Sequence, residues 1–141
     1  MSLTLAEANR MVQAALAKAQ EMNIKLSVAV CDAGGHLLAF NRMEGAIWVS
    51  VAAAQGKAVA ATAFGRPSAA ISADSPVIQS VMASAGGQMV PAQGALPIIR
   101  NGELIGAIGG SGGTSEQDED CARAGLEALY RSSGFRQRAP Q

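Results

Sequence analysis

Residues 94–114 read GALPIIRNGELIGAIGGSGGT, and this stretch decides the fold class. Two β-rich apolar runs, residues 95–100 and 103–110, are separated only by Asn101 and Gly102. The Asn-Gly dipeptide accepts the positive φ angles of a two-residue type I′ turn. The stretch therefore predicts two antiparallel strands joined in a tight hairpin.

The glycine-rich segment after this hairpin, residues 109–113, has almost no side chains and leads to Thr114, where a helix is predicted to begin. A strand that continues through such backbone into a helix N-terminus lets another molecule approach the main chain closely. Gly110, Ser111 and Gly112 are therefore candidate ligand-binding residues. A phosphate cradle is disfavoured, because the segment lacks a Walker lysine and the Rossmann fingerprint.

The composition indicates one globular domain, predicted over residues 1–135, with a disordered tail over residues 136–141. Eleven acidic and eleven basic side chains cancel, which argues against nucleic acid or an anionic membrane as a partner. Residues 1–22 lack the uninterrupted apolar core of a signal peptide, so a cytoplasmic location is expected. Cys31 and Cys121 form no CxxC pair and are predicted to be reduced and buried, without a metal site.

The order of the predicted elements defines an α+β fold. A capping box at Thr4 begins an amphipathic helix, and Ser75-Pro76 begins a short one. The other predicted elements are a hairpin over residues 25–32 and 36–43, an apolar helix over 46–64, a short edge strand at 88–90 and a last helix over 114–132. Hairpins separated by helices imply an antiparallel sheet with helices packed on it.

The segment over residues 46–64 has one formal charge, Lys57, in its length. Its weakly apolar alanines and its polar interruptions argue against a membrane span. A helix that is apolar nearly all round is buried, often partly against another subunit. Trp48 at its start suits such an interface.

Three longer motifs are AVCDAGGHLLAFNRMEGA at residues 29–46, GKAVAATAF at 56–64 and GELIGAIGGSGGTSEQDEDCARAG at 102–125. Together they resemble the GlcG/HbpS-like family, the haem-degrading domain family also found as the C-terminal domain of PduO-type proteins. The resemblance implies a profilin-like domain, with a central antiparallel sheet of about five strands, terminal helices packed on it, and assembly into homo-oligomers. Some relatives bind haem, so the resemblance makes haem, or a related tetrapyrrole, the candidate cofactor.

Charged and polar side chains supply the candidate site. His36 is the only histidine, so a catalytic triad or a conventional haem ligand would have to use it, although its place beside a Gly-Gly turn favours the surface. Arg42 suits a ligand carboxylate or haem propionate, because guanidinium binds carboxylates bidentately; the alternative is an ordinary ion pair with Glu44 or another acidic residue. Glu116 is a further candidate ligand-binding residue at the helix start, where capping and the helix dipole also explain it.

Lys57 and Asp118 are the candidate catalytic residues. An ammonium group in a nearly uncharged helix has to reach water, pair with an acid, or shift its pKa. Asp118 coincides with the acidic position that follows the glycine loop in the family motif, although helix capping and the helix dipole also explain it and are the simpler explanation for this residue alone.

Three functions stay open from the sequence. The first is a small-ligand-binding domain for haem or a related tetrapyrrole, with its pocket near a subunit interface. The second is a small catabolic enzyme that acts on an organic acid or aromatic metabolite through Lys57, Arg42 and Asp118. The third is an oligomeric accessory protein without its own activity.

Overall fold

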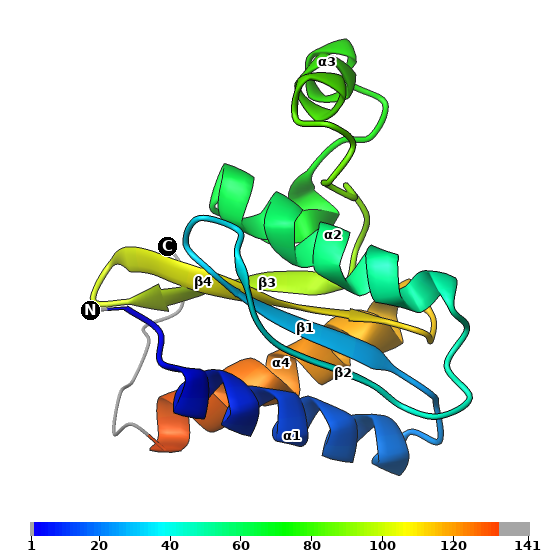
Figure 1. Ribbon diagram of the computed structural model, residues 1–141, viewed down its shortest axis with the longest axis vertical. Helices are drawn as coiled ribbons and strands as arrows, with labels where there is room; N and C mark the ends of the chain where they lie inside the picture. Colours follow the sequence, from blue (N-terminus) through cyan, green and yellow to red (C-terminus); the bar gives the residue numbers. More distant parts are fainter. Residues whose placement is uncertain (1, 133–141) are drawn as a thin grey trace.

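The computed structural model describes residues 2–132, and its elements follow the predicted order (Figure 1). They are α1 (Leu5–Glu21), β1 (Ser27–Asp32), β2 (Leu37–Arg42), α2 (Val49–Phe64), the short 3-10 helix η1 (Ser68–Ala70), α3 (Pro76–Ser84), β3 (Ala95–Arg100), β4 (Glu103–Ser111) and α4 (Ser115–Ser132). The strands form one antiparallel sheet in the order β2-β1-β4-β3. The α+β prediction is confirmed. The predicted tail, residues 136–141, lies outside the described residues.

The sheet separates two layers of helix. α1 and α4 pack together on one face, and α2 covers the other face (Figure 1). The largest core lies under α1 and α4, where Met11, Ile108 and Leu129 are almost completely buried. Alanines of α2 form a thinner layer on the other face, so the backbone of α2 lies close to β4.

Local sequence signals begin the elements as predicted. The Thr4 hydroxyl accepts from the Glu7 N–H at 3.1 Å, and the Glu7 carboxylate accepts from the Thr4 N–H at 2.9 Å, which completes the capping box. Between β3 and β4, Asn101 and Gly102 have φ angles of 52° and 77°, as a type I′ turn requires. Neighbouring residues in the sequence thus specify the start of α1 and the turn between β3 and β4.

The prediction of about five strands is wrong, because the described residues form four. Residues 88–90, predicted as an edge strand, run beside α2 instead, and the Val90 N–H donates to the carbonyl oxygen of Gly56 at 3.0 Å. Pro91 follows directly and has no N–H to donate to a neighbouring strand. The sheet therefore ends at β3, which itself carries Pro97 on the edge.

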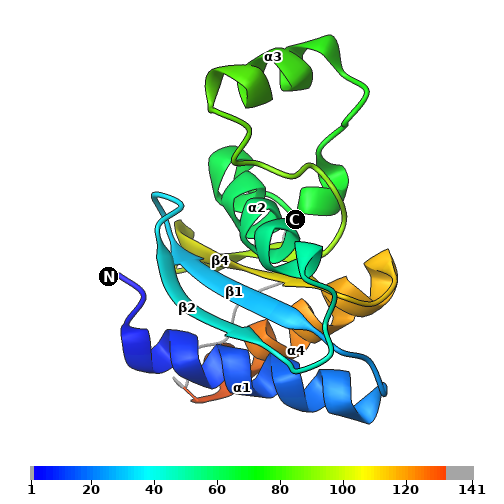
Figure 2. The ribbon, with the colours of Figure 1, turned by 45° about the vertical axis from the view of Figure 1, so that its right-hand side comes forward.

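The helix α3 stands apart from the sheet and its covering helices (Figures 1 and 2). Its predicted start is confirmed, with the Ser75 side chain accepting from the Ile78 N–H at 3.4 Å. None of its residues is buried. Ile78 packs partly against a small cluster around Ala60, whereas Val77 is 70% exposed.

Candidate functional site

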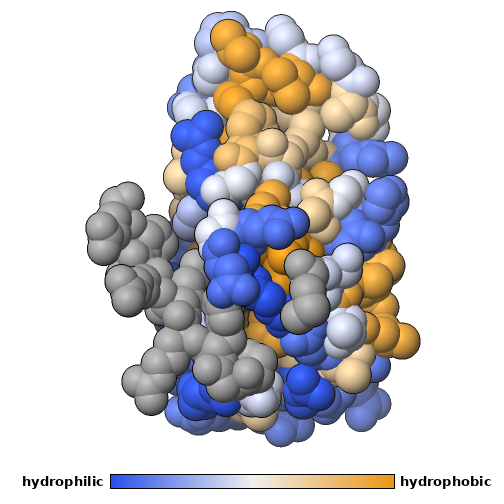
Figure 3. Space-filling model, turned by 90° about the vertical axis from the view of Figure 1, so that its left-hand side faces the viewer, coloured by the Kyte–Doolittle hydropathy of each residue, from blue (hydrophilic) through white to orange (hydrophobic). Residues whose placement is uncertain are grey.

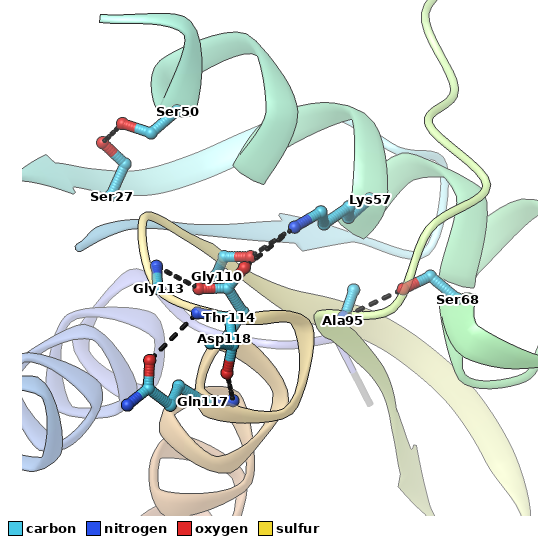
Figure 4. Close-up of polar contacts among 10 residues, drawn as sticks. All are labelled: Ser27, Ser50, Lys57, Ser68, Ala95, Gly110, Gly113, Thr114, Gln117 and Asp118. Atoms are coloured by element: carbon cyan, nitrogen blue, oxygen red, sulfur yellow. Dashed lines mark hydrogen bonds and ion pairs between the residues drawn. The ribbon is translucent and has the colours of Figure 1, made fainter. Parts of the chain in front are cut away.

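Lys57 crosses from α2 to the glycine-rich end of β4 and the first turn of α4 (Figure 4). Its Nζ lies 3.2 Å from Asp118 Oδ2 and 3.2 Å from the carbonyl oxygen of Gly110. The other carboxylate oxygen of Asp118 accepts from the Gly113 N–H at 2.8 Å. Lys57 and Asp118, the candidate catalytic residues, therefore form one ion pair that joins three elements.

This ion pair is almost closed to solvent. The side chains of Lys57 and Asp118 are 8% and 4% exposed. Gly94 lies over the ammonium group with a φ of 148°, and a Cβ atom there would stand 2.9 Å from Lys57 Nζ and 2.7 Å from Gly110 O. A residue without a side chain is therefore needed at position 94 to let the chain close over the pair.

Burial has the larger effect on the Asp118 carboxyl group. Removal from water raises its pKa above the ordinary value, although the N–H groups of Gly113 and Gly112 and the ammonium group of Lys57 act in the opposite direction. Both carboxylate oxygens of Asp118 have hydrogen-bond partners, but burial still makes the ionised form of this side chain less favourable than it is in water. Such a group is typical both of buried structural pairs and of functional sites.

The remaining candidate ligand-binding residues lie at two opposite ends of the sheet. Arg42, Ser27 and Ser111 are partners in one row across β2, β1 and β4, and Gly112 and Glu116 follow Ser111 in the chain. His36 precedes β2 and so lies at the other end, beside Asp32. The structure brings Lys57, Asp118 and Gly110 into contact but does not bring His36 to Arg42.

Among the described residues, no hydrogen bond or ion pair joins Arg42 or Glu116 to the Lys57–Asp118 pair. The guanidinium group of Arg42 donates to the carbonyl oxygen of Ala46 at 2.8 Å, and within residues 2–132 it forms no ion pair with Glu44 or another acidic side chain. Glu116 is exposed at the start of α4. Their ligand-binding roles stay predictions.

His36 is held at the surface by a carboxylate. Its Nδ1 lies 3.1 Å from Asp32 Oδ1, and its side chain is 80% exposed. The surface position expected from the Gly-Gly turn is confirmed. Its partner Asp32 escaped the sequence analysis, although an Asp two residues before a glycine and four before the histidine is the signal of a side chain that bonds the following backbone.

Both thiols are buried and free, as predicted. Burial raises the pKa of Cys31 to about 12 and that of Cys121 to about 11, so neither is a reactive thiolate at neutral pH. Within residues 2–132, no three His, Cys, Asp or Glu side chains gather as metal ligands would. None of the helices in this range is long and apolar enough to cross a membrane.

The family model described as "Haem degrading protein HbpS-like" matches residues 3–127. The chain belongs to this HbpS-like family. The resemblance seen in the motifs is thus confirmed.

Relatives of this HbpS-like chain match it over most of its length. It is 36% identical over 134 residues to an uncharacterised 15.0 kDa protein from the dhaT-dhaS intergenic region of Citrobacter freundii, covering 91% of this chain and 92% of that protein. It is 32% identical over 108 residues to the protein GlcG of Escherichia coli K12, covering 72% and 75% of the two chains. The fold resembles a crystal structure of a PduOC:heme complex, with a TM-score of 0.83 and 30% identity over 91% of this chain and 95% of that one.

A second buried polar contact in this HbpS-like domain also escaped the sequence analysis. The hydroxyl groups of Ser27 on β1 and Ser50 on α2 lie 2.8 Å apart, and both residues are fully buried (Figure 4). Ser50 and Lys57 are seven positions apart, so both lie on the side of α2 that faces the sheet. Polar contacts thus fix α2 on the sheet at two points.

Proposed function

We propose that this chain binds haem or a related tetrapyrrole, with His36 as the iron ligand, on a surface that a second copy of the chain completes. The proposal rests on the hydrogen bonding of the two nitrogen atoms of the His36 imidazole ring. Nδ1 is bonded to Asp32, whereas Nε2 makes no hydrogen bond with any described residue. A neutral imidazole whose other nitrogen is bonded to a carboxylate is a common metal ligand in proteins.

Membership of the HbpS-like family and similarity to the PduOC:heme complex support haem as the ligand class. The residues present fit the group in two respects, because His36 offers a nitrogen donor and the next residue, Leu37, exposes 50% of its surface as an apolar contact. Bound haem would supply a redox-active iron. This chain would supply the His36 imidazole as the iron ligand and an apolar surface against the porphyrin.

One copy cannot enclose a haem at His36, because the imidazole is largely exposed to water. Arg42 lies at the far end of β2, about 20 Å along the strand, so an Arg42 that binds a propionate would have to come from a second copy. The exposed apolar surface suits such association: Trp48 and Val77 are 82% and 70% exposed. Figure 3 shows hydrophobic side chains gathered over α3 at the top of the molecule.

The test is a titration with ferric haem, followed by the Soret absorbance, with the mass of the assembly recorded by light scattering. We expect a saturable shift in the unaltered protein that is lost in His36→Ala and retained in Gln20→Ala, a control on the exposed side of α1. A shift no larger than that given by an unrelated protein would remove haem as the ligand.

The Lys57–Asp118 pair favours a second candidate, a small catabolic enzyme acting on an organic acid or aromatic metabolite. Buried ion pairs with a perturbed pKa are found at active sites as well as in protein cores. A screen with such metabolites tests it: Lys57→Ala should abolish any turnover and leave the Soret shift unchanged. Failure of both screens would support an oligomeric accessory protein without its own activity.

A further inference from the structure

The turn between β1 and β2 is organised around one oxygen atom. Asp32 Oδ1 accepts from the Gly34 N–H at 2.9 Å, from the His36 N–H at 3.0 Å and from His36 Nδ1 at 3.1 Å. Because the backbone and the ring of His36 bind the same oxygen, the ring is held more firmly than an ordinary exposed imidazole. An isolated surface pair of this kind would contribute little to order.

Gly34 provides the space in which the ring lies. A Cβ atom at this position would stand 2.8 Å from His36 Cε1 and 2.9 Å from His36 Nδ1. Those distances are shorter than any normal contact, so alanine here would displace the imidazole. The Nδ1 edge of the ring therefore lies against the Asp32 carboxylate and the main chain of Gly34, while most of the side chain stays exposed.

The same contacts select the tautomer of the ring. A carboxylate only accepts hydrogen bonds, so in the neutral ring Nδ1 carries the proton and Nε2 keeps its lone pair. Asp32 is partly exposed in this turn, and a solvated aspartate is ionised at neutral pH, so the acceptor is an anion.

We propose that Asp32 is a positioning residue for the haem ligand His36: it takes the Nδ1 proton, directs Nε2 outward and increases the electron density that the ring donates to iron. This inference rests on the proposed function. An anionic acceptor on the far nitrogen raises the basicity of a metal-bound imidazole and so favours the more oxidised metal. Gly34 supports the arrangement by leaving room for the ring.

The first experiment uses the haem-free protein. Long-range ¹H–¹⁵N correlation spectra, recorded well above the ordinary pKa of an imidazole, report which ring nitrogen carries the proton. We expect the Nδ1–H tautomer in the unaltered protein and the Nε2–H tautomer, usual for a free imidazole, in Gly34→Ala. A predominant Nε2–H tautomer in the unaltered protein would overturn the inference without bearing on haem binding.

The second experiment measures the reduction potential of the haem-loaded protein. Asp32→Asn keeps an oxygen acceptor for the turn but removes the charge, so we expect the ferric/ferrous equilibrium to shift roughly tenfold toward the ferrous form, which is about 59 mV for one electron. Gly34→Ala should weaken ferric haem binding by roughly tenfold. Asp120→Asn, an exposed carboxylate on α4, is the control for net charge and should change neither quantity.

The outcomes separate the two proposals. If the Soret shift depends on His36 but Asp32→Asn has the same potential as Asp120→Asn, the positioning role is overturned and the proposed function stands. If no shift depends on His36, the proposed function fails and the positioning role in haem binding fails with it. A changed potential in Asp32→Asn alone supports both.

Discussion

Two aspartates of the molecule, Asp118 and Asp32, each meet a nitrogen-bearing side chain at a similar distance, yet the two pairs differ in burial and in the pKa of the carboxyl group. Lys57–Asp118 is buried between α2, β4 and α4, at 3.2 Å. Asp32–His36 lies in an exposed turn, at 3.1 Å. The pKa of Asp118 is raised by burial, whereas the pKa of Asp32 is lowered because hydrogen bonds outweigh its small burial. The direction in which the pKa of a carboxyl group shifts is therefore decided more by its burial and backbone hydrogen bonds than by the presence of a nitrogen partner.

The largest effect should follow from removing one partner of the buried pair. Lys57→Met leaves Asp118 buried without its counter-charge, so we expect the free energy of unfolding in urea to fall by about 3–5 kcal/mol. Lys18→Met removes the same group from an exposed pair with Glu21 and should cost less than about 1 kcal/mol. Equal losses in the two variants would show that the buried pair has no special weight.

Gly94, which lies over the Lys57–Asp118 pair, offers a sharper test of how tightly that pair is packed. At Gly94, alanine would meet both the positive φ and the contacts with Gly110 O and Lys57 Nζ. At Gly102, alanine would meet a positive φ of 77° but open space. Gly94→Ala should therefore lower the free energy of unfolding by about 1–3 kcal/mol more than Gly102→Ala. Indistinguishable urea midpoints would contradict the close packing.

The two carboxylates should also respond to pH in opposite directions. Because the pKa of folded Asp118 exceeds 3.8, its ionisation reduces stability as pH rises from 3.8 through the folded pKa. Asp32 has a lowered pKa, so its stabilisation is complete above pH 3.8 and is lost as pH falls through the folded value. Carboxyl ¹³C shifts recorded against pH should place the midpoint of Asp118 above that of Asp32. The reverse order would refute the comparison.

The smallest effect on stability is expected outside both pairs, on α3. Val77→Ser changes a side chain that is 70% exposed, so the free energy of unfolding should change by no more than about 0.5 kcal/mol. If α3 contributes to association, the mass measured by light scattering should nevertheless fall. Gln79→Ser, a polar change on the same helix, is the control and should leave the mass unchanged. A large loss of stability in Val77→Ser would show that α3 supports the monomer.

Features that depend on residues close together in the sequence were predictable from it. The type I′ turn at Asn101-Gly102, the capping box at Thr4 and the helix start at Ser75 are set by neighbours in the chain, and all three are confirmed. Asp32 and His36 are four residues apart, so their contact was also within reach of sequence reasoning.

The buried pair was harder to predict because its members are 61 positions apart. Lys57 was expected to reach water, pair or shift its pKa, and only the packing of α2 against β4 selects Asp118 as its partner. The missing fifth strand has the same origin, since the Val90 N–H bonds to Gly56 on α2 rather than to the sheet. Long-range packing decides between alternatives that local patterns leave equal.

The proline in β3 has a consequence for contacts between molecules. An edge strand normally presents a row of N–H and C=O groups that can add a strand from another chain and seed aggregation. Pro97 interrupts that row on β3, because it has no N–H to offer. Continuous sheets that extend across copies through this edge are thereby discouraged. Copies that associate at this edge must therefore do so through side-chain contacts rather than by adding a strand.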